Sequence, residues 1–164
     1  MRAGVLSGRT VVLEPLRVEH AEEMAVVLAD AELYRFTGGE PPSADELRAR
    51  YAAQVRGRSG EQWWLNWVIR AQGAAAAGYV QATVEGGIAE LAWVVGVAHQ
   101  GRGLARESVG LVAAWLRGLG VVRLIAHVHP DHAASAAVAR GVGMVPTSVV
   151  EDGERLWEGL PPAP

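Results

Sequence analysis

The sequence predicts a single α/β domain in which strands and helices alternate around one central sheet. The chain has 164 residues, a length that suits one domain, and it contains no internal repeat and no sign of a second domain. Short apolar or alternating runs typical of strands alternate with segments that have the apolar spacing of helices. The expected order is β-α-α-β-β-β-α-β-α-β-β, with an ordered core over about residues 9–159.

A strand and two helices are expected first. Residues 10–16 have the pattern of a strand, and residues 18–29 carry apolar side chains at helical spacing. After a loop, Ser43 and Glu46 have the spacing of a capping box. This predicts a second helix that extends to about Val55.

Three strands are expected next. Residues 62–70 alternate between two faces, and residues 79–85 and 88–97 follow an Ala-rich turn over 73–78. A Gly-Gly pair between the last two strands predicts a hairpin. The alternation in the first strand places Trp63, Leu65, Trp67 and Ile69 on one face and Trp64, Asn66, Val68 and Arg70 on the other.

The second half of the chain has four further elements and a tail. Gly118 and Gly120 are expected to end its long helix, and its first strand is apolar on both faces and so expected in the sheet interior. The predicted elements are a helix over 105–116, a strand over 121–128, a short helix from Asp131 or His132 to Arg140, a hairpin of residues 145–150 with 154–158, and a loose tail over 160–164.

The stretch from Gly96 to Ala105 joins a buried strand to the long helix and is the strongest candidate for a ligand site. Its glycines allow a ligand to approach the backbone closely. The first N–H groups of a helix have no partner inside it, and the helix dipole favours negative charge there. We therefore expect this stretch to hold a phosphate, such as a cofactor pyrophosphate, although a plain Gly-rich helix start is the alternative.

Two well-known phosphate loops fit this stretch poorly. A Walker loop requires Lys followed by Ser or Thr after its second Gly, and this chain has Gly103-Leu104 there. A dinucleotide fingerprint would begin at Gly101 and Gly103, but Arg106 stands where a small residue is required. The ribose-binding acid is also missing, since residues 118–130 contain no Asp or Glu. A nucleotide-dependent oxidoreductase is thus the weaker interpretation.

The pattern Gln100-x-x-Gly103-x-Ala105 resembles the acetyl-CoA loop of the GNAT superfamily of N-acetyltransferases, in which loop amides hold the CoA pyrophosphate. The resemblance covers nearly the whole chain and is best from Glu90 to Met144. It implies a single-domain GNAT-type fold, with a mixed, mostly antiparallel sheet flanked by helices, and acetyl-CoA as cosubstrate. The cofactor-binding residues that it implies are Val95, Gly96, Val97, Gln100, Gly101, Arg102, Gly103, Leu104, Ala105, His132 and Ser135.

Within the superfamily, the N-terminal part resembles the RimJ/RimL-like, or ribosomal-protein acetyltransferase-like, branch. Residues 9–16 and residues 67–70, followed by Gly78-Tyr79, suggest this. Homodimers are frequent in that branch, which is the only basis for expecting one here.

Glu90 is the candidate general base. It lies in an otherwise apolar strand, where a carboxylate must face a cleft or be paired, and burial would raise its pKa towards a useful range. Members of the RimJ/RimL-like branch often carry Glu at this point, where it is implicated as the base. The alternative is a Glu at the strand edge near the Gly87 turn, either solvated or bonded to a neighbour.

Residues 129–135 resemble the family's second cofactor segment. That segment usually has Asn where this chain has His132, which could donate a similar hydrogen bond, and Ser135 matches the Ser three residues on. Ser135 is a candidate to protonate the leaving thiolate, or only to cap the helix or bind pantetheine. The Tyr that serves as the acid in many members is excluded, since residues 136–142 contain none.

Position in the chain singles out two further sets of residues. His127, His129 and His132 could be imagined as metal ligands, but their spacing matches no zinc signature, so no metal is expected. The acceptor site is expected among the two N-terminal helices, their loop and the late hairpin. Its candidate residues are Tyr34, Phe36, Trp64 and Asn66.

Composition limits the remaining possibilities. No apolar run approaches the length of a membrane span, and the N-terminus lacks the apolar core of a signal peptide. The chain has no cysteine, which excludes a thiol nucleophile, and its net charge of −3 argues against nucleic-acid binding. We therefore expect a cytoplasmic protein that contacts neither membrane nor nucleic acid.

Together these features predict an acetyl-CoA-dependent N-acetyltransferase. The acceptor would be a primary amine, on a protein N-terminus or a small molecule. Because no cysteine can carry the acyl group, transfer would be direct, in a ternary complex. The alternative is a non-catalytic acyl-CoA-binding sensor or structural protein on the same scaffold.

Overall fold

The structure, a computed structural model, describes residues 1–71 and 75–161. No helix in these two ranges is long and apolar enough to cross a membrane. The elements, with 3₁₀ turns labelled η, are β1 (Leu6–Ser7), β2 (Val11–Pro15), η1 (Val18–His20), α1 (Ala21–Val27), η2 (Ala31–Tyr34), α2 (Ala44–Gln54), β3 (Arg58–Ser59), β4 (Gln62–Ala71), β5 (Ala76–Glu85), β6 (Ile88–Val95), η3 (Val97–His99), α3 (Leu104–Gly118), β7 (Arg123–Val128), α4 (Ala133–Gly141), β8 (Val145–Glu151) and β9 (Glu154–Gly159).

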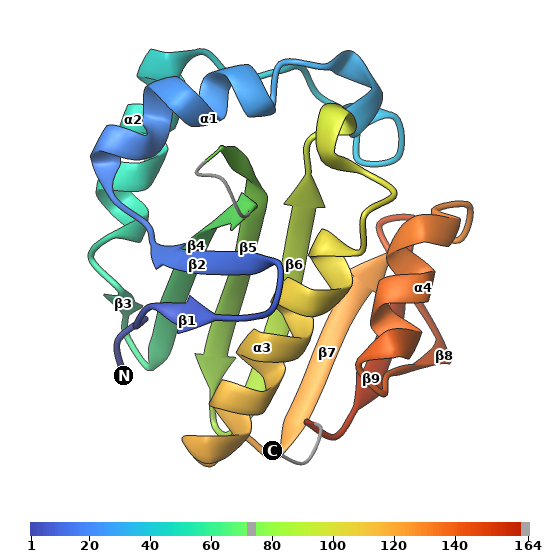
Figure 1. Cartoon of the computed structure of the whole chain (residues 1–164). Coiled ribbons are helices and arrows are strands. Elements are labelled where there is room, and N and C mark those ends of the chain that lie inside the picture. Colours follow the sequence, from blue (N-terminus) through green and yellow to red (C-terminus); the bar gives the residue numbers. More distant parts are fainter. Residues whose placement is uncertain (72–74, 162–164) are drawn as a thin grey trace.

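The strands of the described residues form one nine-stranded sheet (Figure 1). Its order is β1-β2-β4-β5-β6-β7-β9-β8, and β3 pairs with β4. Neighbouring strands are antiparallel except β6 and β7, which are parallel and are connected through α3. The predicted α/β class with a mixed, mostly antiparallel sheet flanked by helices is confirmed.

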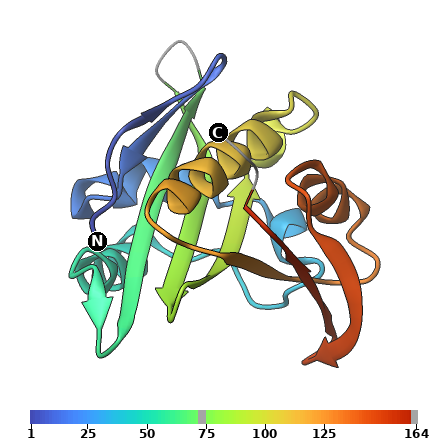
Figure 2. The same ribbon diagram turned by 90° about the horizontal axis from the view of Figure 1, so that it is seen from below.

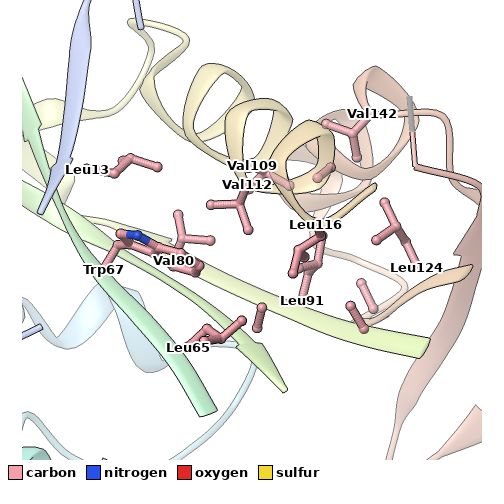
Figure 3. Packing of buried hydrophobic residues seen from close by; sticks show 14 of the residues in the cluster. Leu13, Leu65, Trp67, Val80, Leu91, Val109, Val112, Leu116, Leu124 and Val142 are labelled. Carbon is pink, nitrogen blue, oxygen red and sulfur yellow. The ribbon is translucent and has the colours of Figure 1, made fainter. Parts of the chain in front are cut away.

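Helices cover both faces of the sheet. On α3, Val109, Val112 and Leu116 recur at helical spacing and pack onto buried side chains of β4 to β7 (Figure 3). α4 contributes to the same cluster, and Figure 2 shows α3 and α4 beside each other. On the opposite face, α1 and α2 form a second cluster that includes Met24 and Leu47. The sheet is thus the middle layer of three.

The predicted alternation in β4 is confirmed. Leu65, Trp67 and Ile69 belong to the cluster under α3, whereas Val68 belongs to the cluster under α1 and α2. The two predicted hairpins are also present, because β5 pairs with β6 and β8 pairs with β9, both antiparallel.

The N-terminal helices differ in detail from the predictions. The expected helix over 18–29 is a 3₁₀ turn followed by α1, which ends at Val27. The predicted capping box is only half formed. Ser43 Oγ accepts a hydrogen bond from the Glu46 N–H (3.1 Å), but the Glu46 carboxylate accepts from the Ser43 hydroxyl rather than from its backbone. The cap needs only the first of these two bonds to start α2.

Other differences concern strand ends. The strand expected over 88–97 ends at Val95, where the chain turns into η3. The expected turn over 73–78 lies partly outside the described residues, and its last three residues already belong to β5. The strand expected over 121–128 begins at Arg123 and is not buried on both faces, since the side chains that alternate with its core residues remain partly accessible.

The C-terminal tail, expected to be loose from Leu160, is held in place at Pro161. Pro161 is buried, and its carbonyl accepts a hydrogen bond from the Arg117 guanidinium (2.9 Å). Residues 162–164 lie outside the described residues.

Candidate active site

The strands β6 and β7 pair over only three positions and then separate. The last pair joins Glu90 to Ile125. β6 then continues to Val95, while β7 follows β9 on its other side as far as Val128. Figure 1 shows the two strands diverging beside α3 and α4. The sheet therefore opens into a wedge next to the carboxyl end of β6.

The edge of β6 that faces this wedge offers backbone groups to a ligand. Gly96 N–H donates to the Ala77 carbonyl (2.7 Å), which places its backbone on the β5 side. Because the bonds of an antiparallel ladder alternate, the backbone groups of Trp93 and Val95 point the other way, into the wedge. The Val95 carbonyl accepts a hydrogen bond from Gln100 Nε2 (3.0 Å). The Val95 N–H is left as a donor beside the ladder's open side.

A cleft of about 460 Å³ lies in this wedge. Its walls are the end of β6, the loop between η3 and α3, and the first turn of α4, and Leu33 and Phe36 enclose it from the segment around η2. The cleft is lined by an unpaired strand edge at one end and by the start of a long helix at the other. Such a shape suits an extended ligand that carries a phosphate at its far end.

The loop at the far end has the conformation that glycine permits. Gly101 and Gly103 have φ of 77° and 74°, in the left-handed region, and a Cβ on either would meet nothing within 4 Å. Gly103 is the N-cap of α3, and its carbonyl accepts the N–H of Glu107 (3.1 Å). The N–H groups of the turn between them have no partner inside the helix. Open space and unpaired amides together make an anion cradle.

Not every predicted cofactor residue lies in the cleft. Val95, Gln100, Gly101, Gly103, Leu104, Ala105, His132 and Ser135 line it. Arg102 instead lines an adjoining cavity of about 470 Å³. Gly96 and Val97 do not belong to the lining of the cleft. A Cβ on Gly96 would lie 2.9 Å from Val27 of α1, so glycine here permits a close approach between the end of β6 and α1.

His132 and Ser135 interact at the start of α4. His132 is the N-cap, and its Nδ1 accepts the Ser135 N–H (3.1 Å), while Nε2 lies 3.3 Å from Ser135 Oγ. Since Nδ1 accepts, the neutral ring carries its proton on Nε2 and donates to Oγ. The Phe36 ring packs on His132, with centroids 4.6 Å apart. Ser135 therefore keeps its own hydroxyl proton available to the cleft.

Burial lowers the pKa of His132 below its usual value, and the neighbouring His129 acts in the same direction. The folded state thus binds this proton less tightly than the unfolded state, so the stability contributed by the neutral ring is complete above about pH 6.5 and declines as the pH falls towards the folded pKa. We expect His132→Asn, which preserves the cap, to remove this decline. Denaturant unfolding of both proteins at pH 7.5 and 5.5 measures it; equal pH dependence in the two would contradict the prediction.

Glu90 is paired and partly exposed, and it lacks the burial that makes a carboxylate more basic. Its side chain is 48% exposed and lies on the face of β6 opposite α3, where Oε1 is 3.0 Å from His127 Nδ1. The neighbouring residues Ala89 and Leu91 point into the core, so the alternation of the strand turns Glu90 outwards. The carboxylate is paired, as a charge in an apolar strand should be, but by a histidine of the next strand.

The four candidate acceptor residues are not brought together. Phe36 lies against the cofactor cleft, whereas Trp64 and Asn66 line a separate cavity of about 330 Å³ near the N-terminus. Asn66 is buried, and its Oδ1 accepts a hydrogen bond from Gln81 (2.8 Å). The Tyr34 hydroxyl donates to the Leu28 carbonyl (2.8 Å), which holds the end of α1. Proximity in sequence and strand face did not predict a common pocket.

The three histidines considered as metal ligands do not converge. His127 contacts Glu90, His132 contacts Ser135, and His129 packs its ring against Phe36 at 5.2 Å. Over residues 1–71 and 75–161, no group of three or more metal-binding side chains is assembled.

Comparison with known proteins identifies the family. A family model described as an acetyltransferase (GNAT) domain matches residues 10–145. The chain belongs to the GNAT acetyltransferase family. The match spans the cleft, its glycine loop and α4, so the GNAT assignment rests on the part of the chain that forms the site. No curated protein sequence gives a significant match.

Solved GNAT structures share the fold at low sequence identity. An acetyltransferase of the GNAT family from Bacillus anthracis superposes with a TM-score of 0.79 at 14% identity, covering 96% of this chain and 98% of the other. A protein described as a GNAT-family acetyltransferase from Bordetella pertussis gives 0.75 at 24% identity, with 95% and 99% covered. One described as a ribosomal-protein-serine acetyltransferase from Vibrio cholerae gives 0.75 at 18%, with 98% and 100% covered.

Two features of this GNAT site were not anticipated. Arg9 and Arg106 line the adjoining cavity together with Arg102, so three arginines gather beside the start of α3. No helical spacing relates these arginines, because Arg102 lies in the loop before α3 and Arg9 comes from the N-terminal segment. The contact of His127 with Glu90 joins residues 37 positions apart, and no local pattern indicates it.

Proposed function

We propose that this GNAT protein transfers the acetyl group of acetyl-CoA to a primary amine, directly and in a ternary complex. The observation that carries the proposal is the cleft between the parted strands, which follows the free edge of β6 and ends at the left-handed glycines of the α3 loop. One end presents strand-edge backbone groups and the other an anion cradle, and these are the two features that a pantetheine arm with a pyrophosphate requires.

The residues present fit coenzyme A. Acetyl-CoA supplies an acyl group activated as a thioester. The N–H groups at the first turn of α3 would bind the pyrophosphate, and Arg102 and Arg106 would add positive charge on the side of the adjoining cavity. The Val95 N–H, on the open side of β6, would bind an extended arm or polarise a carbonyl oxygen. Gln100 is better assigned to the support of the loop, through its bond to Val95.

The proposed acid is Ser135. Its hydroxyl lies in the lining of the cleft, and the hydrogen bond that His132 donates to Oγ leaves the hydroxyl proton free to be given to a leaving sulfur. Glu90 lies on the face of the sheet opposite α3, at the point where β6 and β7 separate. An acceptor that approaches from that face would meet its carboxylate before it met the thioester. The location of Ser135 and Glu90 on different sides of the sheet supports transfer between two substrates that enter from opposite sides.

The acceptor class is proposed from the activities printed for similar structures. They include a RimL ribosomal L7/L12 alpha-N-protein acetyltransferase in complex with coenzyme A, a spermidine N-acetyltransferase chimera, and AAC(6')-Ib in complex with paromomycin and acetyl-CoA. These acceptors differ in size, but each presents an amine. A cationic amine also suits a face that carries Glu90 and a neighbouring carboxylate, Glu151.

Calorimetric titration with acetyl-CoA, with NAD as the control ligand, tests the cofactor. We expect binding of acetyl-CoA and none of NAD. A screen of N-terminal peptides, polyamines and aminoglycosides, followed by detection of the released thiol, then tests transfer. Failure of a folded sample to bind acetyl-CoA would overturn the proposal. Binding without thiol release to any amine would favour the non-catalytic acyl-CoA-binding protein.

A further inference from the structure

The exposure of Glu90 raises the question of which group takes the proton from the acceptor amine. Burial is the means by which a carboxylate becomes basic enough to accept a proton near neutral pH. Glu90 lacks that burial, since its side chain is 48% exposed. Histidine is the side chain that most often serves as a general base in enzymes, and it needs no burial to do so. Glu90 contacts a histidine, His127.

His127 extends from β7 just beyond the last pair that this strand makes with β6. Ala126 and Val128 belong to the core under α3, so the alternation of β7 places His127 on the other face, the face of Glu90. Its side chain is 25% exposed, which leaves the ring accessible from that face. It therefore lies beside the opening of the wedge, on the side away from α3.

The contact with Glu90 fixes the tautomer of the ring. His127 Nδ1 lies 3.0 Å from Glu90 Oε1. An ionised carboxylate can only accept hydrogen bonds, so Nδ1 carries the proton and Nε2 of the neutral ring has a free lone pair. Nε2 is 3.8 Å from Glu151 Oε2, beyond hydrogen-bonding distance. One ring nitrogen is thus held by a carboxylate while the other remains available to a substrate.

We propose that His127 is the catalytic base for the acceptor amine and that Glu90 is a positioning residue that holds its ring. This inference rests on the proposed acetyl transfer. Glu90 holds Nδ1, which leaves Nε2 as the ring nitrogen that can accept a proton, and its carboxylate stabilises the positive charge that the ring acquires. Glu151 adds a second negative charge near Nε2, which favours the approach of a cationic amine.

The proton balance is complete with these groups. The ammonium form of the acceptor gives one proton to His127 Nε2, which becomes an imidazolium and later releases the proton to water. The nitrogen lone pair then forms the C–N bond while the C–S bond breaks. The departing sulfur takes a proton from Ser135, and the second proton lost by the nitrogen passes through water to Ser135 Oγ and restores its hydroxyl.

The test measures kcat and KM by thiol release with an amine from the screen, together with calorimetric binding of acetyl-CoA. We expect His127→Ala to lower kcat by about 10²-fold or more, the usual range for loss of a general base, with acetyl-CoA binding unchanged. Added imidazole should restore activity in proportion to its concentration, because it replaces the missing ring. Glu90→Gln should lower kcat less than His127→Ala, because an amide still holds Nδ1–H but without charge.

The matched control is Glu158→Gln, which removes the same charge from the neighbouring strand β9, where Glu158 pairs with Arg123. We expect its kcat to be unchanged. The inference is overturned if His127→Ala retains wild-type kcat, or if imidazole fails to restore activity and Glu90→Gln causes the greater loss. In either case the wild-type protein still transfers acetyl groups. Absence of thiol release by the wild-type protein would instead overturn the proposed function itself.

Discussion

Replacing Gly103 with valine is expected to weaken acetyl-CoA binding by about tenfold or more, equivalent to at least about 1.4 kcal/mol. Gly103 has a φ of 74°, and a Cβ at this position would project into open space at the start of α3. That space is where the proposed pyrophosphate lies against the helix amides. A β-branched residue also costs about 1–3 kcal/mol in this conformation, so the loop would relax and lose its cradle.

The backbone strain needs its own control. Gly153, in the turn between β8 and β9, has a φ of 79° and likewise has nothing within 4 Å of a Cβ. Gly153→Val should lose similar stability yet bind acetyl-CoA as the wild-type protein does. Calorimetry of both variants, with unfolding curves to confirm the matched strain, separates the two effects. Wild-type affinity in Gly103→Val would remove the loop from the binding site.

Replacing Gly78 with alanine is expected to cost about 3 kcal/mol of folding stability, at the upper end of overpacking effects. A Cβ on Gly78 would lie 2.0 Å from the Val94 carbonyl oxygen and 2.9 Å from Val95 Cα. These are backbone atoms of the paired strand β6, which cannot rotate aside as a side-chain tip can. The two strands must therefore separate, and β6 must shift where its free edge lines the cleft. We expect acetyl-CoA affinity to fall together with stability.

Gly110→Ala provides the contrasting control for the same chemical change. Gly110 lies within α3, and its Cβ would make an ordinary contact of 3.9 Å with Val142. Alanine there should stabilise the protein by about 0.5–1 kcal/mol, because glycine is unfavourable inside a helix. Denaturant unfolding measures both variants. Equal stability of Gly78→Ala and the wild-type protein would show that β5 and β6 tolerate a wider spacing.

Local patterns in the sequence predicted most of the fold. The alternation in β4, the glycines between β5 and β6, and the strand–loop–helix around Gly103 each follow from a few neighbouring residues. The short strands β1 and β3 were missed because two residues carry no periodicity, and they exist only through pairing with β2 and β4. Local propensity says little about such edges.

The site was predicted less completely, for a physical reason. The glycine loop and Ser135 both line the cleft, and they could be singled out because each belongs to a motif of a few neighbouring residues. The exposure of Glu90 depends on which face β6 turns towards α3, and its contact with His127 depends on β7 lying beside β6. Such side-chain pairs across strands distant in sequence are set by register and not by spacing along the chain.

The separation of β6 from β7 also bears on solubility. It leaves an unpaired strand edge in the middle of a sheet, and exposed edges of this kind can recruit strands of other molecules and start aggregation. Here the edge lies inside a cleft between the loop before α3 and the first turn of α4, enclosed further by Phe36. A slim extended chain can enter, but a second strand with its own neighbours cannot. The feature proposed to bind the cofactor is thereby protected from self-association.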